Sequence, residues 1–276
     1  MDGMRLEHVI IRVDDLDTAI QDYRALGFAV VPGGVHGSGF THNALIHFLD
    51  GSFLELIAFR RRLILIALAK LGLLDLLLKN TDNHVKYRFT SAIGFPEGFI
   101  DSALLTGNIA ADIRQANERG LRTTKAVPFE RQKPGGEMVR WNIMSPFADA
   151  LPFVRDAYAP AQPVGADDTS HENGALGIAR VHYVVRDLAA AKRDYEHLLG
   201  NEIALTAGEG KQRAEFELDG TTIALLPAAE DPELNAVLDE KRECPVEVTL
   251  RTGEKASIGQ LPEEQSHRAR IILARG

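Results

Sequence analysis

The sequence predicts an α+β fold assembled from repeated βαβββ modules, and two observations support this prediction. Residues 6–28, LEHVIIRVDDLDTAIQDYRALGF, and residues 178–200, IARVHYVVRDLAAAKRDYEHLLG, both read as a strand, an Asp-started helix and a Gly exit. A further Asp-Gly pair, typical of tight hairpins, follows each copy, at 50–51 and at 219–220. Repetition of a whole supersecondary unit indicates duplicated modules. We expect a site between modules, where each copy contributes different residues.

The elements of the first module follow in order. Residues 6–13 alternate as a strand does, Asp15 is a good N-cap, and Gly27 ends a helix with apolar residues at helical spacing. Three more strands are predicted at 28–32, 41–49 and 53–59. The Gly-rich stretch GGVHGSG between the first two of these is predicted as a connection at the rim, because it lacks the ending of a phosphate loop.

The same pattern continues downstream. A shift of 93 places Asn108 on Asp15 and so indicates a fainter second module. Strand-like pieces at 246–251 and 269–274 are either a degenerate fourth copy of the module or an addition to the third sheet. The predicted domain plan is 1–158 as two modules (about 5–60 and 98–157) with a helical insert at 61–80, then a linker at 159–173 and a third module at 174–276.

Composition excludes several classes of function. The net charge of −8 argues against nucleic acid as a partner, and the single cysteine allows no internal disulfide. The apolar run 63–78 is too short to span a membrane, so it is predicted to be buried or to cover a hydrophobic opening or a subunit interface. The N-terminus shows no signal peptide, so a cytoplasmic location is expected.

The chain resembles the glyoxalase/bleomycin-resistance/dioxygenase superfamily, also called vicinal oxygen chelate. The resemblance rests on residues 6–28, on THNALIHFLDGSFLELIAF at 41–59 and on RWNIMSP and LPFV, and the last three stretches look closest to its glyoxalase-like domain branch. It implies paired modules that form a cupped, incomplete barrel with strand 1 of each module beside strand 4. It is specific for fold and much less so for reaction, since members include isomerases, lyases, epimerases, ring-cleaving dioxygenases and metal-free binding proteins.

The resemblance also implies where a metal would bind. Its strand-1 and strand-4 ligand positions hold His8 and Glu55, and the shift of 93 places Asp101 on His8. Such donors suit Mn, Fe, Co, Ni or Zn, and no nucleotide cofactor is expected. Glu55 is also the expected catalytic proton carrier. The alternatives are a polar pair that binds ligand without metal, or a structural pair with an arginine such as Arg140.

Substrate contacts are predicted from strand geometry. A two-residue turn at Asp50-Gly51 would pair Ile46 with Glu55, which puts His42 on the face of Glu55 as a substrate contact or gate. Arg140 and Asn142 alternate with Trp141, so one of the two sets faces the cup. The first set suits a carboxylate or carbonyl group, and Trp141 suits a flat apolar one.

The favoured function is a metal-dependent isomerase, lyase or dioxygenase acting on a small, partly hydrophobic, oxygenated substrate. The first alternative is a metal-free binding protein of the bleomycin-resistance type. The second is an inactive scaffold that forms a homodimer through 63–78. The third module holds Arg180 and Ala224 at the positions of His8 and Glu55, which indicates a supporting role.

Overall fold

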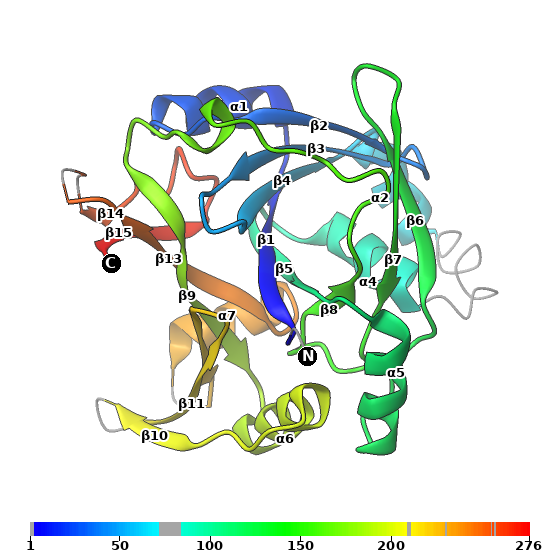
Figure 1. Cartoon of the computed structure of the whole chain (residues 1–276), viewed down its shortest axis with the longest axis vertical. Helices are drawn as coiled ribbons and strands as arrows, with labels where there is room; N and C mark the ends of the chain where they lie inside the picture. Colours follow the sequence, from blue (N-terminus) through cyan, green and yellow to red (C-terminus); the bar gives the residue numbers. More distant parts are fainter. Residues whose placement is uncertain (1–2, 72–83, 209–210, 230, 255, 257) are drawn as a thin grey trace.

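Eight strands close into a barrel in the first half of the chain (Figure 1). The computed structural model describes residues 3–71, 84–208, 211–229, 231–254, 256 and 258–276. Around the barrel the order is β1-β4-β3-β2-β6-β7-β8-β5. The strands are β1 (Arg5–Val13), β2 (Val31–His36), β3 (Thr41–His47), β4 (Phe53–Phe59), β5 (Gly98–Leu105), β6 (Val127–Gln132), β7 (Met138–Met144) and β8 (Phe153–Arg155).

The barrel is closed where the sequence predicted an incomplete one. Closure comes from the pairing of β2 with β6, which sets His36 opposite Arg131. The predicted rim connection therefore begins as strand. Glycines permit the close approach, since a Cβ on Gly33 would lie 2.1 Å from Asn43 Oδ1 and one on Gly34 would lie 2.1 Å from the Gln132 carbonyl oxygen.

The hairpin of β3 and β4 has a different register from the predicted one. Phe48 N–H donates to Ser52 O, so the loop holds three residues, 49–51, instead of two. Leu45 therefore lies opposite Glu55, and Ile46 lies opposite Leu54. The predicted pairing was wrong by one residue, which moves every β3 side chain to the other face.

Helices α1 (Leu16–Ala25) and α5 (Ile109–Glu118) accompany the two barrel modules. Their N-caps confirm the predicted starts, because Asp15 accepts from Thr18 N at 2.8 Å and Asn108 accepts from Ala111 N at 3.1 Å. Each helix follows the first strand of its module, as the repeat requires.

The insert between β4 and β5 packs on the interior cluster of the barrel. It holds α2 (Arg62–Lys70), α4 (His84–Ser91) and a short 3₁₀ turn, and residues 72–78 of the predicted helix lie outside the described residues. Leu65, Val85 and Ile93 join the apolar cluster inside the barrel. Only Leu65 of these three belongs to the run 63–78, in which Leu63, Ile64 and Leu71 are exposed. Cover of a hydrophobic opening and a homodimer through this run both stay predictions. Among the described helices, none is long and apolar enough to cross a membrane.

The second half of the chain forms a seven-stranded sheet ordered β10-β11-β12-β9-β13-β15-β14. This order reproduces β2-β3-β4-β1-β5-β8-β7 of the barrel, so β13 and β15 of the tail occupy the places of a fourth module. The sheet stays open because it has no counterpart of β6 in the described chain. Its elements are β9 (Ala175–Val185), α6 (Leu188–Leu199), β10 (Leu205–Gly208), β11 (Lys211–Leu218), β12 (Thr221–Pro227), α7 (Pro232–Glu240), β13 (Cys244–Thr252), β14 (Gly259–Gln260) and β15 (Arg270–Arg275).

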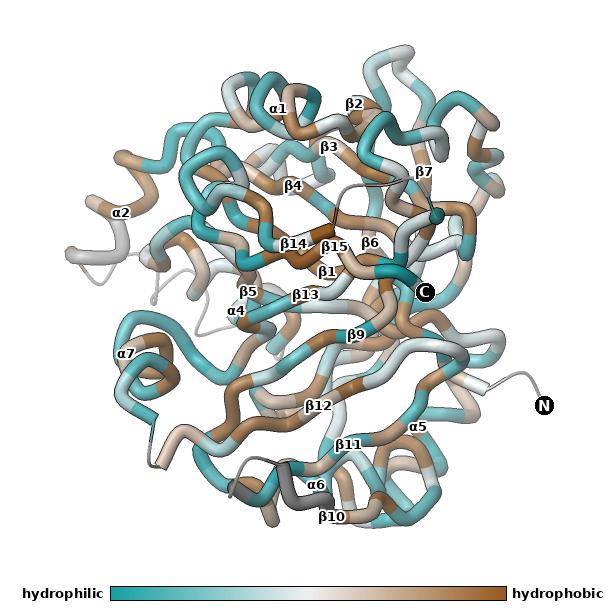
Figure 2. Tube along the Cα trace, turned by 90° about the vertical axis from the view of Figure 1, so that its left-hand side faces the viewer, coloured by the Kyte–Doolittle hydropathy of each residue, from teal (hydrophilic) through white to brown (hydrophobic). Residues whose placement is uncertain are grey.

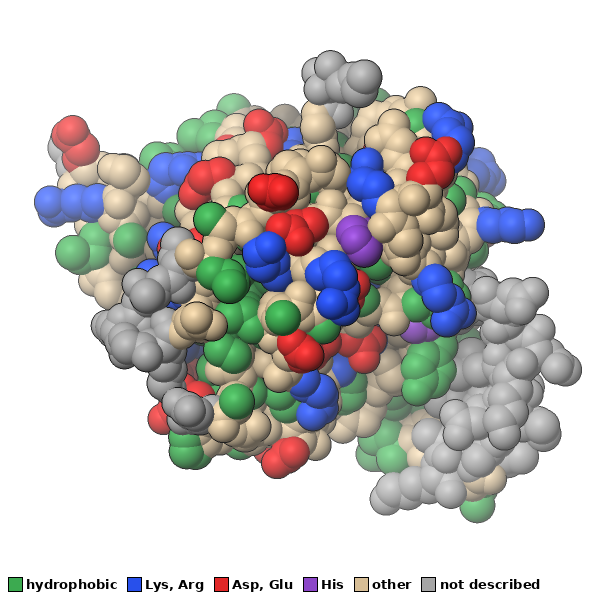
Figure 3. Space-filling view, turned by 90° about the horizontal axis from the view of Figure 1, so that it is seen from below, with side chains coloured by type: hydrophobic (Ala, Val, Ile, Leu, Met, Phe, Trp, Pro, Cys, Tyr) green, Lys and Arg blue, Asp and Glu red, His purple; other side chains and the backbone are tan. Residues whose placement is uncertain are grey.

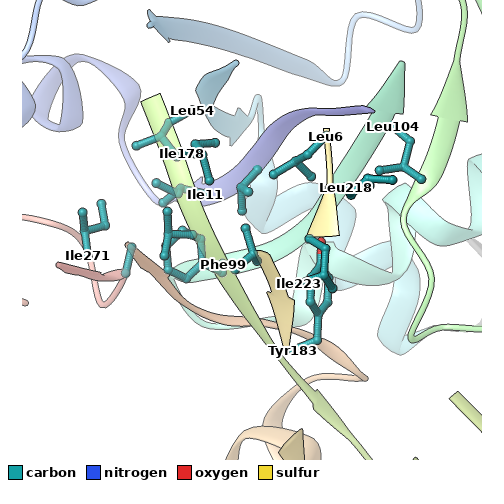
Figure 4. Packing of buried hydrophobic residues seen from close by; sticks show 14 of the residues in the cluster. Leu6, Ile11, Leu54, Phe99, Leu104, Ile178, Tyr183, Leu218, Ile223 and Ile271 are labelled. Atoms are coloured by element: carbon teal, nitrogen blue, oxygen red, sulfur yellow. The ribbon is translucent and has the colours of Figure 1, made fainter. Parts of the chain in front are cut away.

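One large apolar core joins the barrel to this sheet. Figure 2 shows hydrophobic residues along the central strands, including β9 and β12. Figure 4 shows part of the core, which contains Leu6, Ile11, Leu54, Phe99 and Leu104 from the barrel and Ile178, Tyr183, Leu218, Ile223 and Ile271 from the sheet. The barrel interior is a separate cluster, so the candidate site is isolated from this junction.

Candidate active site in the barrel

A buried chain of ionisable side chains starts at His8 on β1. Its Nε2 atom lies 3.3 Å from Glu55 Oε2 on β4, and its Nδ1 atom lies 3.2 Å from Glu7 Oε2. His8 is 3% exposed and Glu55 is 7% exposed. The structure thus brings together His8 and Glu55, the two ligand candidates that the sequence placed on strands 1 and 4.

The two carboxylates decide the charge of this group. Burial opposes ionisation, but hydrogen bonding and the charge of His8 hold the pKa of Glu55 at about 2. Burial lowers the pKa of His8, yet Glu55 and Glu7 outweigh burial and raise it. The pKa of Glu7 is lowered because its bonds to His8 and the charge of Arg155 overcome burial. The carboxylate at each ring nitrogen thus favours the charged, imidazolium form of His8.

His36 and Asn43 complete the polar end of the site. Asn43 Nδ2 donates to Glu55 Oε1 at 2.6 Å, and His36 Nε2 lies 3.8 Å from the same oxygen. Burial lowers the pKa of His36, so this second imidazole is neutral. The two imidazoles beside Glu55 are therefore shifted in opposite directions, because the pKa of His8 is raised and that of His36 is lowered.

Aromatic rings and arginines line the other side of the chain. The Arg155 guanidinium carbon lies 3.5 Å from the centre of the Tyr158 ring and 5.6 Å from that of Trp141. Arg131 lies 5.5 Å from the Tyr158 ring centre. Arg155 Nη1 is 3.2 Å from Glu7 Oε2, the oxygen that also contacts His8. One carboxylate oxygen thus links the arginine–aromatic side to the imidazole.

Apolar rings enclose the imidazole. Phe53 stacks on His8 with ring centroids 4.4 Å apart, and Phe153 meets it edge-on at 5.7 Å. Phe89 of α4 packs on Phe153 at 5.3 Å, so the insert reaches the wall of the site. Removal of water strengthens each electrostatic contact inside. A ligand reaches His8 only after the surrounding side chains move.

Asp101 does not join this group. Ala103 lies opposite His8, and Asp101 lies opposite Ile10. Both Asp101 oxygens are occupied: Arg88 of α4 binds them at 2.6 Å, and Arg242 binds Oδ2 at 2.7 Å. The structure gives Asp101 a role in holding the insert to the barrel and to the second sheet.

Of the predicted substrate contacts, only Trp141 faces the interior. It joins the apolar cluster of the barrel, whereas Arg140 is exposed beside Glu130 and Asn142 bonds to Asp156. His42 lies on the opposite face of β3 from Asn43 and Glu55, as the corrected register requires. The structure therefore does not place His42, Arg140 or Asn142 at the site.

The donors do not form a metal centre as they stand. In the described parts of the chain, no three side chains of His, Cys, Asp or Glu are grouped so that they could hold an ion. His8 Nε2 instead faces Glu55 Oε2 at 3.3 Å, and an imidazole must be neutral to act as a ligand. A divalent ion at this site therefore stays a prediction.

Sequence reasoning missed several residues of this site, among them Glu7, His36 and Arg155. A signal existed for His36, because two adjacent glycines before it indicate close approach of strands as well as a loop. No sequence signal marked Glu7, because strict alternation along β1 would point its side chain away from the face of His8. The register shift between Leu6 and His8 changes this alternation. Arg155 lies in a short strand whose face depends on barrel closure.

The second sheet also carries charge pairs, but none among the described residues repeats the arrangement of Glu7, His8 and Glu55. His182 Nδ1 lies 2.9 Å from Glu247 Oε1, and Arg180 Nη1 lies 2.6 Å from Glu215 Oε1. These residues are half-buried, and the supporting role expected for the third module stays a prediction. The face seen in Figure 3 mixes acidic and basic side chains, and so lacks the single-sign patch typical of nucleic-acid binding.

The chain matches one protein family in sequence and several solved proteins in structure. Residues 6–199 match the family model described as a glyoxalase-like domain, and no curated protein matches the sequence. A hypothetical protein from Staphylococcus aureus is similar in structure, with a TM-score of 0.73 and 12% identity over 99% of this chain and 100% of that one.

Two named proteins are similar over most of this chain. One is a triple mutant of 4-hydroxymandelate synthase from Streptomyces coelicolor, with a TM-score of 0.56 and 11% identity over 96% of this chain and 78% of that one. The other is a Mn(II)-bound glyoxalase from Novosphingobium aromaticivorans, with a TM-score of 0.50 and 12% identity over 91% and 66%. At these identities the likeness shows the fold alone.

Proposed function

Because the chain belongs to the glyoxalase-like domain family, we propose that its barrel is the active site of an enzyme. The reaction is proton transfer, of isomerase or lyase type, on a small, partly hydrophobic, oxygenated substrate. The observation that carries the proposal is the buried His8 imidazole with one carboxylate at each ring nitrogen. Chemistry next to a carbonyl needs an acid for the oxygen and a base for the carbon, and this group offers both.

Loss of a proton from His8 and the basicity of Glu55 are coupled. His8 Nε2–H donates a proton to the substrate oxygen on which charge develops. Loss of that proton removes the charge that keeps the pKa of Glu55 low, so Glu55 becomes a stronger base as His8 acts as an acid. Glu7 accepts from Nδ1 and keeps the imidazole oriented throughout.

A divalent ion stays a prediction. The name of one similar structure includes Mn(II), and His8, Glu55 and His36 are chemically suited to Mn, Fe, Co, Ni or Zn. Since these donors are paired with each other and not grouped around a common point, the proposed steps use side chains alone.

A binding protein is the second candidate function. The aromatic lining by Trp141, Tyr158 and Phe153 favours it, because such rings retain a flat ligand without reacting. A binding protein needs affinity alone, whereas the proton-transfer site also needs Glu55 to ionise.

Isotope exchange separates the two functions without a known product. We expect wild type to exchange α-C–H for deuterium in D₂O on small aromatic carbonyl compounds, followed by NMR, and Glu55→Gln to lose at least about a hundredfold of that rate. Glu130→Gln, an exposed carboxylate change on β6, is the matched control. Equal exchange by wild type and Glu55→Gln would refute the proposal. A melting temperature that rises when the ligand is added, without deuterium exchange, would favour the binding protein.

A further inference from the structure

Several buried arginines have donor nitrogens without acceptors among the described residues, and two of them lie beside the Tyr158 ring. Arg155 is 1% exposed and Arg131 is 4% exposed. Arg155 Nη2 and Arg131 Nε have no hydrogen-bond partner among the described residues. Arg155 Nη1 lies 3.2 Å from Glu7 Oε2 but outside hydrogen-bonding geometry. Folded proteins pair nearly all buried donors, so each exception calls for an explanation such as water, an ion or a ligand.

The free edge of Arg155 has a defined direction. Its Nε donates to the Asp156 carbonyl oxygen at 2.8 Å, and its plane is held by the Tyr158 ring at 3.5 Å. What remains is the edge formed by the two Nη atoms. Two parallel donors in one plane match the two oxygens of a carboxylate better than any single-atom acceptor.

Charge around this edge also favours an anion. Glu7 is the one carboxylate within ion-pair distance of Arg155 in the described chain, and it is shared with His8. Arg131 has no ion pair among the residues described and lies beside the same Tyr158 ring. Arg155 therefore shares its single carboxylate with His8, and Arg131 has none within ion-pair distance among the described residues.

We propose that the barrel recognises a small planar carboxylic acid, with its carboxylate on Arg155 and Arg131 and its ring against Trp141. This inference rests on the proposed function, because it takes the interior of the barrel as the substrate site. It names the substrate class: an unsaturated or aromatic acid that also carries the oxygen on which His8 acts.

Trp141 makes binding at this place observable, because it is the chain's single tryptophan and lies 5.6 Å from Arg155. Trp141 emission is followed while wild type is titrated with phenylacetate or with phenylacetamide, its neutral isostere. We expect the acid to bind at least about tenfold more tightly, the usual effect of one charged hydrogen bond. Equal affinities, or no binding of either, would overturn the inference.

Variants test the assignment to Arg155. Arg155→Lys keeps the charge and loses the paired donors, so we expect phenylacetate affinity to fall about tenfold or more while phenylacetamide affinity is unchanged. Arg140→Lys, at an exposed site on β7, is the control. Circular dichroism checks the fold of each variant, and the wild-type comparison stands without them. Unchanged acid affinity in Arg155→Lys would overturn the assignment.

The two proposals fail separately. Preference for the acid without deuterium exchange leaves this inference standing and rejects the proposed reaction. Exchange that depends on Glu55, without preference for the acid, rejects this inference alone.

Discussion

At the scale of single residues, the environment of His8 depends on what faces each of its ring nitrogens. Glu7 is its neighbour in sequence, and Glu55 is its neighbour across a parallel strand pair. Without either carboxylate, burial would keep the imidazole neutral. The role of His8 as an acid in the proposed reaction therefore depends on the carboxylates of both Glu7 and Glu55.

The pairing of Glu55 with His8 can be measured from the free energy of unfolding at acidic pH. Its pKa is lowered from 4.5 to about 2, so its contribution to the free energy of unfolding is complete above pH 4.5 and lost as pH falls toward 2. We expect wild type to lose roughly 3 kcal/mol relative to Glu55→Gln across this window. Urea unfolding at pH 6, 4 and 3 measures the difference. Parallel stability curves for the two proteins would contradict it.

At the scale of elements, the sequence predicted the strand–helix units and missed the pairing at their edges. The starts of α1 and α5 were predictable because capping is local. The register of β3 was not, because a loop of two or of three residues fits the same letters and only the strand partner decides between them. His42 was assigned to the site for that reason.

Closure of the barrel depends on Gly34. Its φ of 138° and the 2.1 Å approach of the Gln132 carbonyl oxygen leave no place for a methyl group. We expect Gly34→Ala to lower the free energy of unfolding by about 2 kcal/mol or more. Gly135→Ala, where a Cβ meets nothing within 4 Å, is the control. Equal melting temperatures for the two variants would show that β2 and β6 do not need this contact.

The insert is held by a buried charge network. Arg242, from the segment before β13, binds Asp101 at 2.7 Å and the Arg88 carbonyl oxygen at 3.0 Å. We expect Arg242→Gln to raise hydrogen exchange in α4 about tenfold, since it removes contacts that anchor the helix. Exchange in α5 should stay unchanged, as measured by mass spectrometry on the same sample. Equal protection of α4 in both proteins would contradict this anchoring role.

At the scale of the whole molecule, the barrel and the second sheet share one core. Leu6 and Leu104 lie in the same cluster as Ile178 and Ile223 (Figure 4). The two parts are therefore distinct in sequence and continuous in packing, because residues of both sheets and of the helices beside them belong to one apolar cluster.

Truncation tests this dependence. We expect residues 1–158 alone to expose an apolar face, bind a hydrophobic dye and sediment as aggregates, because a large uncovered patch drives association. The full chain under the same conditions is the control. A monomeric fragment with the melting temperature of the full chain would show that the barrel is independent of the second sheet.

The sequence by itself determined the repeated modules, the family resemblance and the approach of His8 to Glu55, since strand 1 pairs with strand 4 within one module. It also predicted Trp141 as one of two alternatives for the interior face. The tertiary structure alone decided what depends on pairing between distant segments. Closure through β2 and β6 brought in His36, and the register shifts between β1 and β5 turned Glu7 inward and left Asp101 with arginines. The reason is physical: local order follows from neighbouring residues, whereas the face of a strand residue changes with a shift of one position.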